Sequence, residues 1–137
     1  MENETFANFS ELPIPDSIKA NLEHIGIGAP TPIQAAAIPK ILNGKDLIGQ
    51  SQTGSGKTAA YLVPVIAQLN PALSVVQAIA LTPTRELCVQ VAEVAYGLVH
   101  GTGLRVMAIF GGFSIEIQSA ALRQGVHAAR LEARGDD

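Results

Sequence analysis

Apolar residues near the start of the chain recur with helical spacing. Ile18, Leu22 and Ile25 lie four and three residues apart, which places them on one face of a helix that opens at Pro15. Glycines follow this segment and end the helix. A second helix is expected over residues 33–42, and the Asn-Gly pair that follows directly is expected to end it.

Short apolar runs alternate with helical patterns in the rest of the chain. Three runs are interpreted as strands, with 76–81 expected to be buried: residues 46–49, 76–81 and 104–110. Helical spacing lies between and after them, over residues 59–69, 85–99 and 115–122. This alternation predicts an α/β fold in which helices cover both faces of a parallel sheet. Residues 1–25 are interpreted as a lead-in with a first helix, and residues 26–137 as one domain.

Composition agrees with a globular protein and narrows its partners. The 137 residues are 47% hydrophobic, 15% charged and 4% aromatic, with a net charge of −3. Because the chain has no overall positive field, contact with RNA would need a local patch or backbone amides. The single cysteine, Cys88, excludes an internal disulfide. No apolar run approaches the roughly 18 residues of a membrane span, and no leader is recognisable, so a cytoplasmic protein is expected.

A glycine-rich loop at residues 51–58 carries the strongest chemical signal. Gly54 and Gly56 allow successive N–H groups to turn toward a phosphate, and the helix that follows adds its free N-terminal amides. Lys57 provides a charge for the β- and γ-phosphates, and the hydroxyl of Thr58 is a candidate ligand for Mg²⁺. A turn that merely caps a helix is the alternative. The apolar run before the loop and the helix after it favour a nucleotide site.

Four segments in order resemble motifs of the DEAD-box RNA helicases. Residues 26–34 (GIGAPTPIQ) are similar to the Q motif, with the aromatic Phe9 17 residues upstream, and the loop at 51–58 resembles motif I. Residues 83–87 (PTREL) are similar to motif Ia, and the pair at 111–112 to a glycine doublet. The resemblance implies a three-layer RecA-like P-loop fold, incomplete in this chain, that binds ATP with Mg²⁺ and contacts RNA.

The resemblance also assigns residues to the nucleotide. The nucleotide-binding set is Phe9, Ile27, Thr31, Gln34, Ser51, Gln52, Thr53, Gly54, Ser55, Gly56, Lys57 and Thr58. Lys57 would stabilise charge in the transition state, and the amide of Gln34 offers the donor and acceptor that an adenine edge requires. Read alone, Gln34 is a polar residue near a helix start, and Phe9 is equally well a core anchor. Ile27 stands where the family usually has an aromatic residue.

A second set of residues is assigned to RNA: Pro83, Thr84, Arg85, Gly111 and Gly112. The turn before a helix offers free amides to an RNA phosphate, and a glycine pair lets the RNA backbone approach closely. Each assignment has a plainer alternative. Thr84 would also serve as a helix N-cap beside a solvated Arg85, and Gly111-Gly112 as a tight turn after a strand.

The acidic D-E-A-D segment and the second lobe, which the family needs for hydrolysis, are absent from this sequence. The tail at 128–137 is atypical: it is rich in alanine and charge, and no strand is expected there. The chain is therefore interpreted as an N-terminal fragment of an RNA helicase that is not itself catalytic. A non-catalytic remnant that binds nucleotide or RNA is the alternative. Self-association through an open sheet edge is expected as well.

Overall fold

The computed structural model describes residues 5–111 and 115–132, except for the side chains of 128–132. The chain divides into two compact units after Gln68, and each is described by itself. Gly112, one of the residues assigned to RNA, and residues 133–137 of the tail lie outside the described residues. In the part of the chain that is described, no helix has the length and apolar character needed to cross a bilayer.

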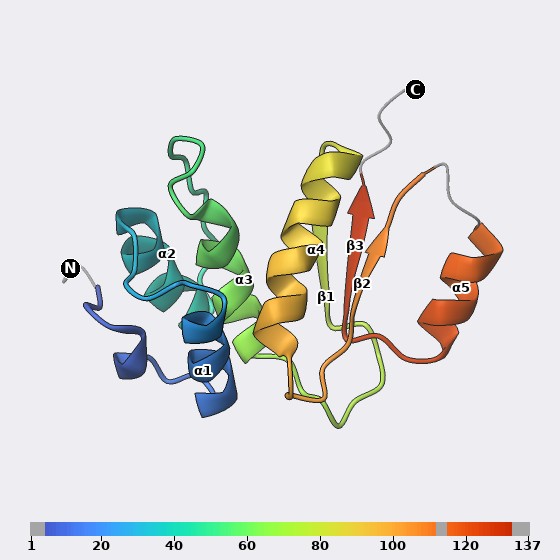
Figure 1. Cartoon of the computed structure of the whole chain (residues 1–137), viewed down its shortest axis with the longest axis horizontal. Coiled ribbons are helices and arrows are strands. Elements are labelled where there is room, and N and C mark those ends of the chain that lie inside the picture. Colours follow the sequence, from blue (N-terminus) through green and yellow to red (C-terminus); the bar gives the residue numbers. More distant parts are fainter. Residues whose placement is uncertain (1–4, 112–114, 133–137) are drawn as a thin grey trace. The chain divides into compact units, whose positions relative to one another are not determined.

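The first unit consists of helices. Its elements are a 3-10 helix η1 (Phe9–Glu11), α1 (Asp16–His24), α2 (Pro32–Leu42) and α3 (Lys57–Ala67), which Figure 1 shows in blue to green. The two helices predicted before residue 45 are confirmed, and α2 packs along α3. Ile18 and Leu22 are buried as expected. Ile25 is not, with 37% of its surface exposed, because it lies beyond α1 where the chain reverses at Gly26.

The segment at 46–49 does not form the strand that the sequence suggests. A strand is defined by pairing, and no backbone hydrogen bond joins these residues to another described segment. Leu47 and Gly49 line a pocket of the first unit, whereas the side chain of Ile48 is 97% exposed. Within the described part of the first unit, the segment therefore has one side facing helices and no strand paired with it.

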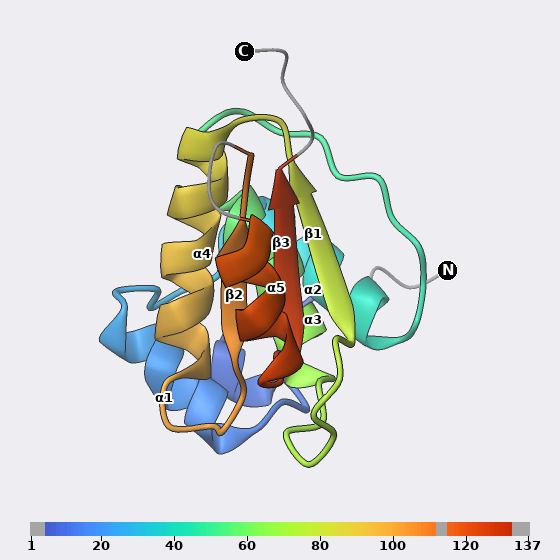
Figure 2. The same ribbon diagram turned by 90° about the vertical axis from the view of Figure 1, so that its right-hand side faces the viewer.

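The second unit combines a parallel sheet with two helices. Its elements are β1 (Ala78–Thr82), α4 (Arg85–Val99), β2 (Val106–Ile109), α5 (Ile115–Arg123) and β3 (Ala128–Glu132), and the strand order is β1-β3-β2. Helix α4 packs against all three strands. In Figures 1 and 2, α4 and α5 lie on opposite sides of the sheet, as the alternating pattern predicts.

The prediction that the tail has no strand was wrong. Residues Ala128–Glu132 form β3, the central strand, which pairs with β1 from Ala78↔Ala128 to Thr82↔Glu132 and with β2 from Val106↔Ala128 to Ile109↔Leu131. A central strand receives backbone hydrogen bonds from both neighbours, and these do not depend on β-branched side chains. Composition alone therefore missed an element that its neighbours specify.

The predicted burial of the first sheet strand was also wrong. β1 begins two residues later than expected, and Ile79 and Leu81 are 59% and 69% exposed. Thr82, on the opposite face of the strand, is buried. β1 is an edge strand of the described sheet, so the helices on the two faces of the sheet cover it less completely than they cover a central strand.

A buried histidine joins the starts of the three strands. The backbone carbonyl of His127 accepts from the N–H groups of Gln77 and Ala78, and its own N–H donates to the carbonyl of Arg105. Its ring is held as well, because Nδ1 accepts from the Arg105 N–H at 2.9 Å and Nε2 lies 3.2 Å from the carbonyl of Pro71. His127 is therefore a structural residue of the second unit.

Candidate functional site

The loop at 51–58 has the backbone that a phosphate-binding loop requires. Gly54 and Gly56 have φ of 83° and 91°, a left-handed conformation that side chains disfavour. Gly56 is the N-cap of α3, so the first N–H groups of that helix, which have no partner within the helix, lie directly after the loop. This arrangement provides the N–H groups and the positive helix end that attract an anion.

Lys57 lies across this loop. Its ammonium Nζ donates to the carbonyl of Ser51 at 2.7 Å, and the hydroxyls of Ser51 and Ser55 are hydrogen-bonded to each other. The ammonium group of Lys57, which is expected to bind phosphate, thus joins the two ends of the loop. Thr58, the candidate Mg²⁺ ligand, is half-buried in the first turn of α3. In the described residues, no group of three acidic, histidine or cysteine side chains is arranged to hold a metal.

Gln34 links the helix α2 to the loop. Its side chain is 2% exposed, its Oε1 accepts from the N–H of Thr31 at 3.0 Å, and its Nε2 donates to the carbonyl of Gly56 at 3.1 Å. The structure therefore brings together Gln34, Thr31 and Gly56, three residues that the sequence assigned to the nucleotide. The plainer reading of Gln34 is also correct in part, because the amide closes the N-terminus of α2.

Close contact explains why residue 56 is glycine. A Cβ added to Gly56 would lie 2.5 Å from Nε2 of Gln34 and 2.9 Å from the hydroxyl of Thr31. At Gly54 the same addition would meet nothing within 4 Å. The two glycines share a backbone conformation, but only Gly56 also needs the space.

Phe9 and Ile27 are placed by the fold of the first unit. Phe9 is buried and packs on Phe6 with ring centroids 5.3 Å apart, which is the core-anchor role. Ile27 is half-buried, and its N–H donates to the carbonyl of Leu22 at the end of α1. These contacts account for both residues without a nucleotide, and their family role stays a prediction.

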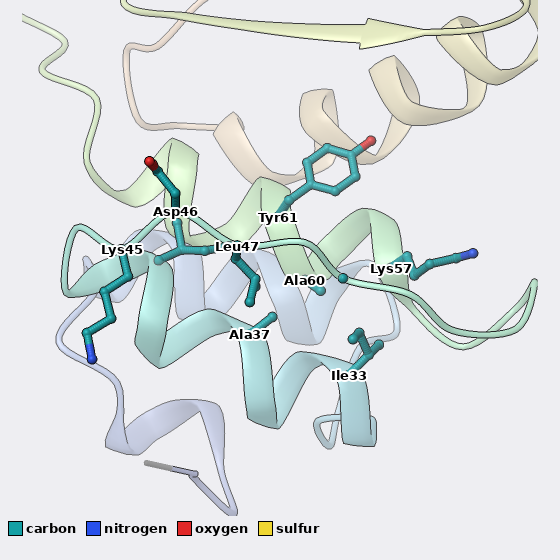
Figure 3. A pocket seen from close by; sticks show the side chains of 10 residues that line it. Ile33, Ala37, Lys45, Asp46, Leu47, Lys57, Ala60 and Tyr61 are labelled. Atoms are coloured by element: carbon teal, nitrogen blue, oxygen red, sulfur yellow. The ribbon is translucent and has the colours of Figure 1, made fainter. Parts of the chain in front are cut away.

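A pocket of about 400 Å³ lies beside the loop, within the first unit (Figure 3). It is lined from α2, from the unpaired segment after it and from α3: Ile33, Ala37, Ile41, Lys45, Asp46, Leu47, Gly49, Lys57, Ala60 and Tyr61. Lys57 is the member that the sequence assigned to nucleotide, and Figure 3 shows its amine pointing away from the apolar lining. The pocket therefore adjoins the candidate phosphate site without coinciding with it.

In the second unit, the turn before α4 is well capped. The Thr84 hydroxyl accepts from the N–H of Leu87 at 3.1 Å, and the buried Thr82 donates to the carbonyl of Thr84 at 3.4 Å. Thr84 is thus the N-cap that its position suggests, while Pro83, Thr84 and Arg85 stay exposed. A cap that orders the turn is compatible with a role in binding a phosphate.

Arg85 is engaged by the protein rather than freely solvated. Its Nη2 donates to the carbonyl of Gly111 at 2.6 Å, and its guanidinium carbon lies 5.0 Å from the centre of the Phe110 ring. The residue therefore joins the start of α4 to the end of β2, two segments that the sequence assigned separately to RNA. We use the name RNA surface for the described residues that the sequence assigned to RNA: Pro83, Thr84, Arg85 and Gly111.

One contributing residue was missed by sequence reasoning. Gln118 on α5 is 8% exposed, and its Oε1 accepts from the N–H of Phe110 at 3.0 Å. A single glutamine in an amphipathic helix has no distinguishing pattern, so the sequence contained no signal for this contact. Phe110 is the first residue beyond β2, where the ladder with β3 has ended.

Comparison with known proteins places these features in a family. A family model described as DEAD/DEAH box helicase matches residues 31–131. The ATP-dependent RNA helicase DeaD of Escherichia coli is 46% identical over 118 residues, which cover 85% of this chain and 19% of that protein. The DEAD-box ATP-dependent RNA helicase CshA of Geobacillus kaustophilus is 44% identical over 119 residues, 87% of this chain and 26% of that protein.

Solved structures agree with this match. A DEAD box protein from Methanococcus jannaschii has a TM-score of 0.86 at 36% identity, covering 94% of this chain and 35% of its own. The RNA-helicase Prp28 from Chaetomium thermophilum, solved bound to ADP, has a TM-score of 0.81 at 38% identity, covering 93% and 32%. The expected RecA-like fold with a partial sheet is confirmed. The chain spans about a fifth to a third of these relatives.

Proposed function

The chain belongs to the DEAD/DEAH box helicase family, and we propose that it is the nucleotide-binding front part of an ATP-dependent RNA helicase. ATP with Mg²⁺ would bind at the loop 51–58, with the phosphates at the start of α3. The observation that carries this proposal is the loop itself: two left-handed glycines, a lysine across its mouth and a buried amide that holds Gly56.

The residues present fit such a ligand. Because Gly56 has no Cβ, Gln34 and Thr31 can pack directly against the backbone of the loop. Lys57 can exchange the carbonyl of Ser51 for a phosphate oxygen. Thr58 would supply one hydroxyl ligand to Mg²⁺, which neutralises phosphate charge when bound. Gln34 supports the site by fixing Gly56, and a further contact of its amide with adenine is part of the proposal. Its Nε2 keeps a second N–H for this purpose.

We further propose that these 137 residues bind ATP without turning it over. Hydrolysis in this class needs carboxylates that hold Mg²⁺ and align water, and charge stabilisation from a second lobe. The sequence has no D-E-A-D segment to provide the carboxylates. RNA-stimulated release of phosphate is therefore expected to equal the buffer control. Turnover that Lys57→Ala abolishes would contradict this part of the proposal.

Calorimetry of ATP with Mg²⁺ tests the nucleotide site. Lys57→Ala is expected to weaken binding by about 10- to 150-fold, because a charged hydrogen bond contributes roughly 1.5–3 kcal/mol. Lys40→Ala removes an equal charge from the exposed face of α2 and serves as the matched control. Equal binding by wild type and Lys57→Ala would exclude the loop as the site. RNA binding without any ATP binding would favour a non-catalytic RNA-binding remnant.

A further inference from the structure

Two side chains hold the end of β2 in place beside the start of α4. Gln118 accepts from the N–H of Phe110 at 3.0 Å, and Arg85 donates to the carbonyl of Gly111 at 2.6 Å. Arg85 also covers the ring of Phe110 at 5.0 Å. Successive residues are thus fixed from two directions, by helices that begin 30 residues apart in the chain.

We infer that Gln118 and Arg85 are positioning residues, which order Phe110 and Gly111 so that the RNA surface is formed before RNA arrives. This inference rests on the proposed function, because it concerns the same RNA-binding segment. It differs in the role of Arg85, whose guanidinium acts through Gly111, and it adds Gln118, a residue without charge.

The need for such positioning follows from the position of Gly111. It lies two residues beyond β2, where the pairing with β3 has ended, and a Cβ at Gly111 would meet nothing within 4 Å. A glycine in open space loses more conformational freedom on ordering than any other residue. Binding RNA at an unfixed glycine would include that loss, whereas a backbone already held by two side chains has lost the freedom on folding.

Gln118 and Arg85 differ in burial, and they therefore differ in how each can affect RNA binding. Gln118 is 8% exposed and offers RNA little accessible surface, so its effect on binding must pass through Phe110. Arg85 is exposed, and a guanidinium has five N–H groups, so direct contact with a phosphate is the competing role. The two roles of Arg85 predict different salt dependences. Removing a phosphate ligand lowers the slope of log affinity against log salt by about 0.7 for a single strand, whereas removing a positioning residue leaves the slope unchanged.

The first measurement needs no RNA. Backbone ¹⁵N relaxation of the full chain is expected to give Gly111 an order parameter near that of rigid backbone, about 0.85. Gln118→Leu and Arg85→Ala are each expected to lower it, while Gln90→Leu, which alters an exposed glutamine on α4, leaves it unchanged. An unchanged order parameter in Gln118→Leu and Arg85→Ala would overturn the inference.

The second measurement is fluorescence anisotropy with labelled oligouridylate at several salt concentrations. Gln118→Leu and Arg85→Ala are expected to weaken binding by about five- to tenfold with the salt slope of wild type, and Arg85→Lys to recover only part of the loss, since lysine cannot reproduce the planar contact. A reduced slope in Arg85→Ala would make Arg85 a phosphate ligand and overturn its positioning role. Absence of RNA binding by wild type would instead remove the proposed RNA function, and the order parameters would still decide the inference.

Discussion

The two units contain the same kind of side-chain hydrogen bond in different surroundings. In each, a side chain from the first turn of a helix donates a hydrogen bond to a glycine carbonyl of a distant segment: Gln34 to Gly56 in the first unit, Arg85 to Gly111 in the second. Gln34 is a neutral amide with 2% exposure, whereas Arg85 is a charged group in contact with solvent. Loss of the buried bond of Gln34 is therefore expected to cost more than loss of the solvent-exposed bond of Arg85.

The largest expected effect comes from the glycine in the buried member of this pair. Gly56→Ala forces a side chain into a left-handed backbone, which costs about 1–2 kcal/mol, and displaces Gln34 from its hydrogen bond, which costs roughly 1–3 kcal/mol more. The first unit is expected to lose about 2–5 kcal/mol of stability, and ATP binding is expected to be lost with it. Hydrogen exchange of peptides from α2 and α3 measures this loss separately from the second unit.

Gly54→Ala is the matched control for this substitution. Its φ of 83° brings the same backbone strain, but its Cβ has open space. A loss of only about 1–2 kcal/mol is therefore expected. Equal losses for the two variants would show that the contact between Gly56 and Gln34 contributes nothing beyond the backbone conformation.

The next largest effects are expected when the donor side chains, Gln34 and Arg85, are themselves removed. Gln34→Ala removes one of the two donors to the Gly56 carbonyl, which keeps the N–H of Ala60, and leaves the part-buried N–H of Thr31 without its acceptor. An unsatisfied group of this kind costs about 1–3 kcal/mol. Arg85→Ala removes an exposed hydrogen bond and a ring contact, for which about 0.5–1 kcal/mol is expected. Exchange protection in α2 and in β2 reports each loss within its own unit. Gln50→Ala, an exposed glutamine before the phosphate loop, is expected to leave both unchanged.

The sequence predicts best those features that depend on contacts between residues close together in the chain. Helix α4 was expected over residues 85–99 and is found at Arg85–Val99, because Thr84 caps it through a residue three positions away. Strand β3 was not expected, since its pairing partners lie about 20 and 50 residues earlier in the chain. The contact of Gln118 with Phe110 was missed although only eight residues separate them, because a single glutamine in an amphipathic helix has no distinguishing pattern. The loop 51–58 was recognised because its glycines and Lys57 lie close together in the chain and shape only nearby backbone.

An effect as small as that of Arg85→Ala concerns self-association, which we propose occurs through the edge of the sheet in the second unit. Leu81 on the edge strand β1 is 69% exposed, next to the row of backbone groups that an unpaired edge presents. Leu81→Lys adds a charge there and is expected to weaken dimerisation by about fivefold, which corresponds to roughly 1 kcal/mol. Sedimentation velocity over a range of concentrations measures the change. Ile48→Lys makes the equivalent change in the first unit, at a residue 97% exposed, and is expected to leave dimerisation unaltered. If Ile48→Lys has the larger effect, the unpaired segment at 46–49 mediates association instead, and the sheet edge does not.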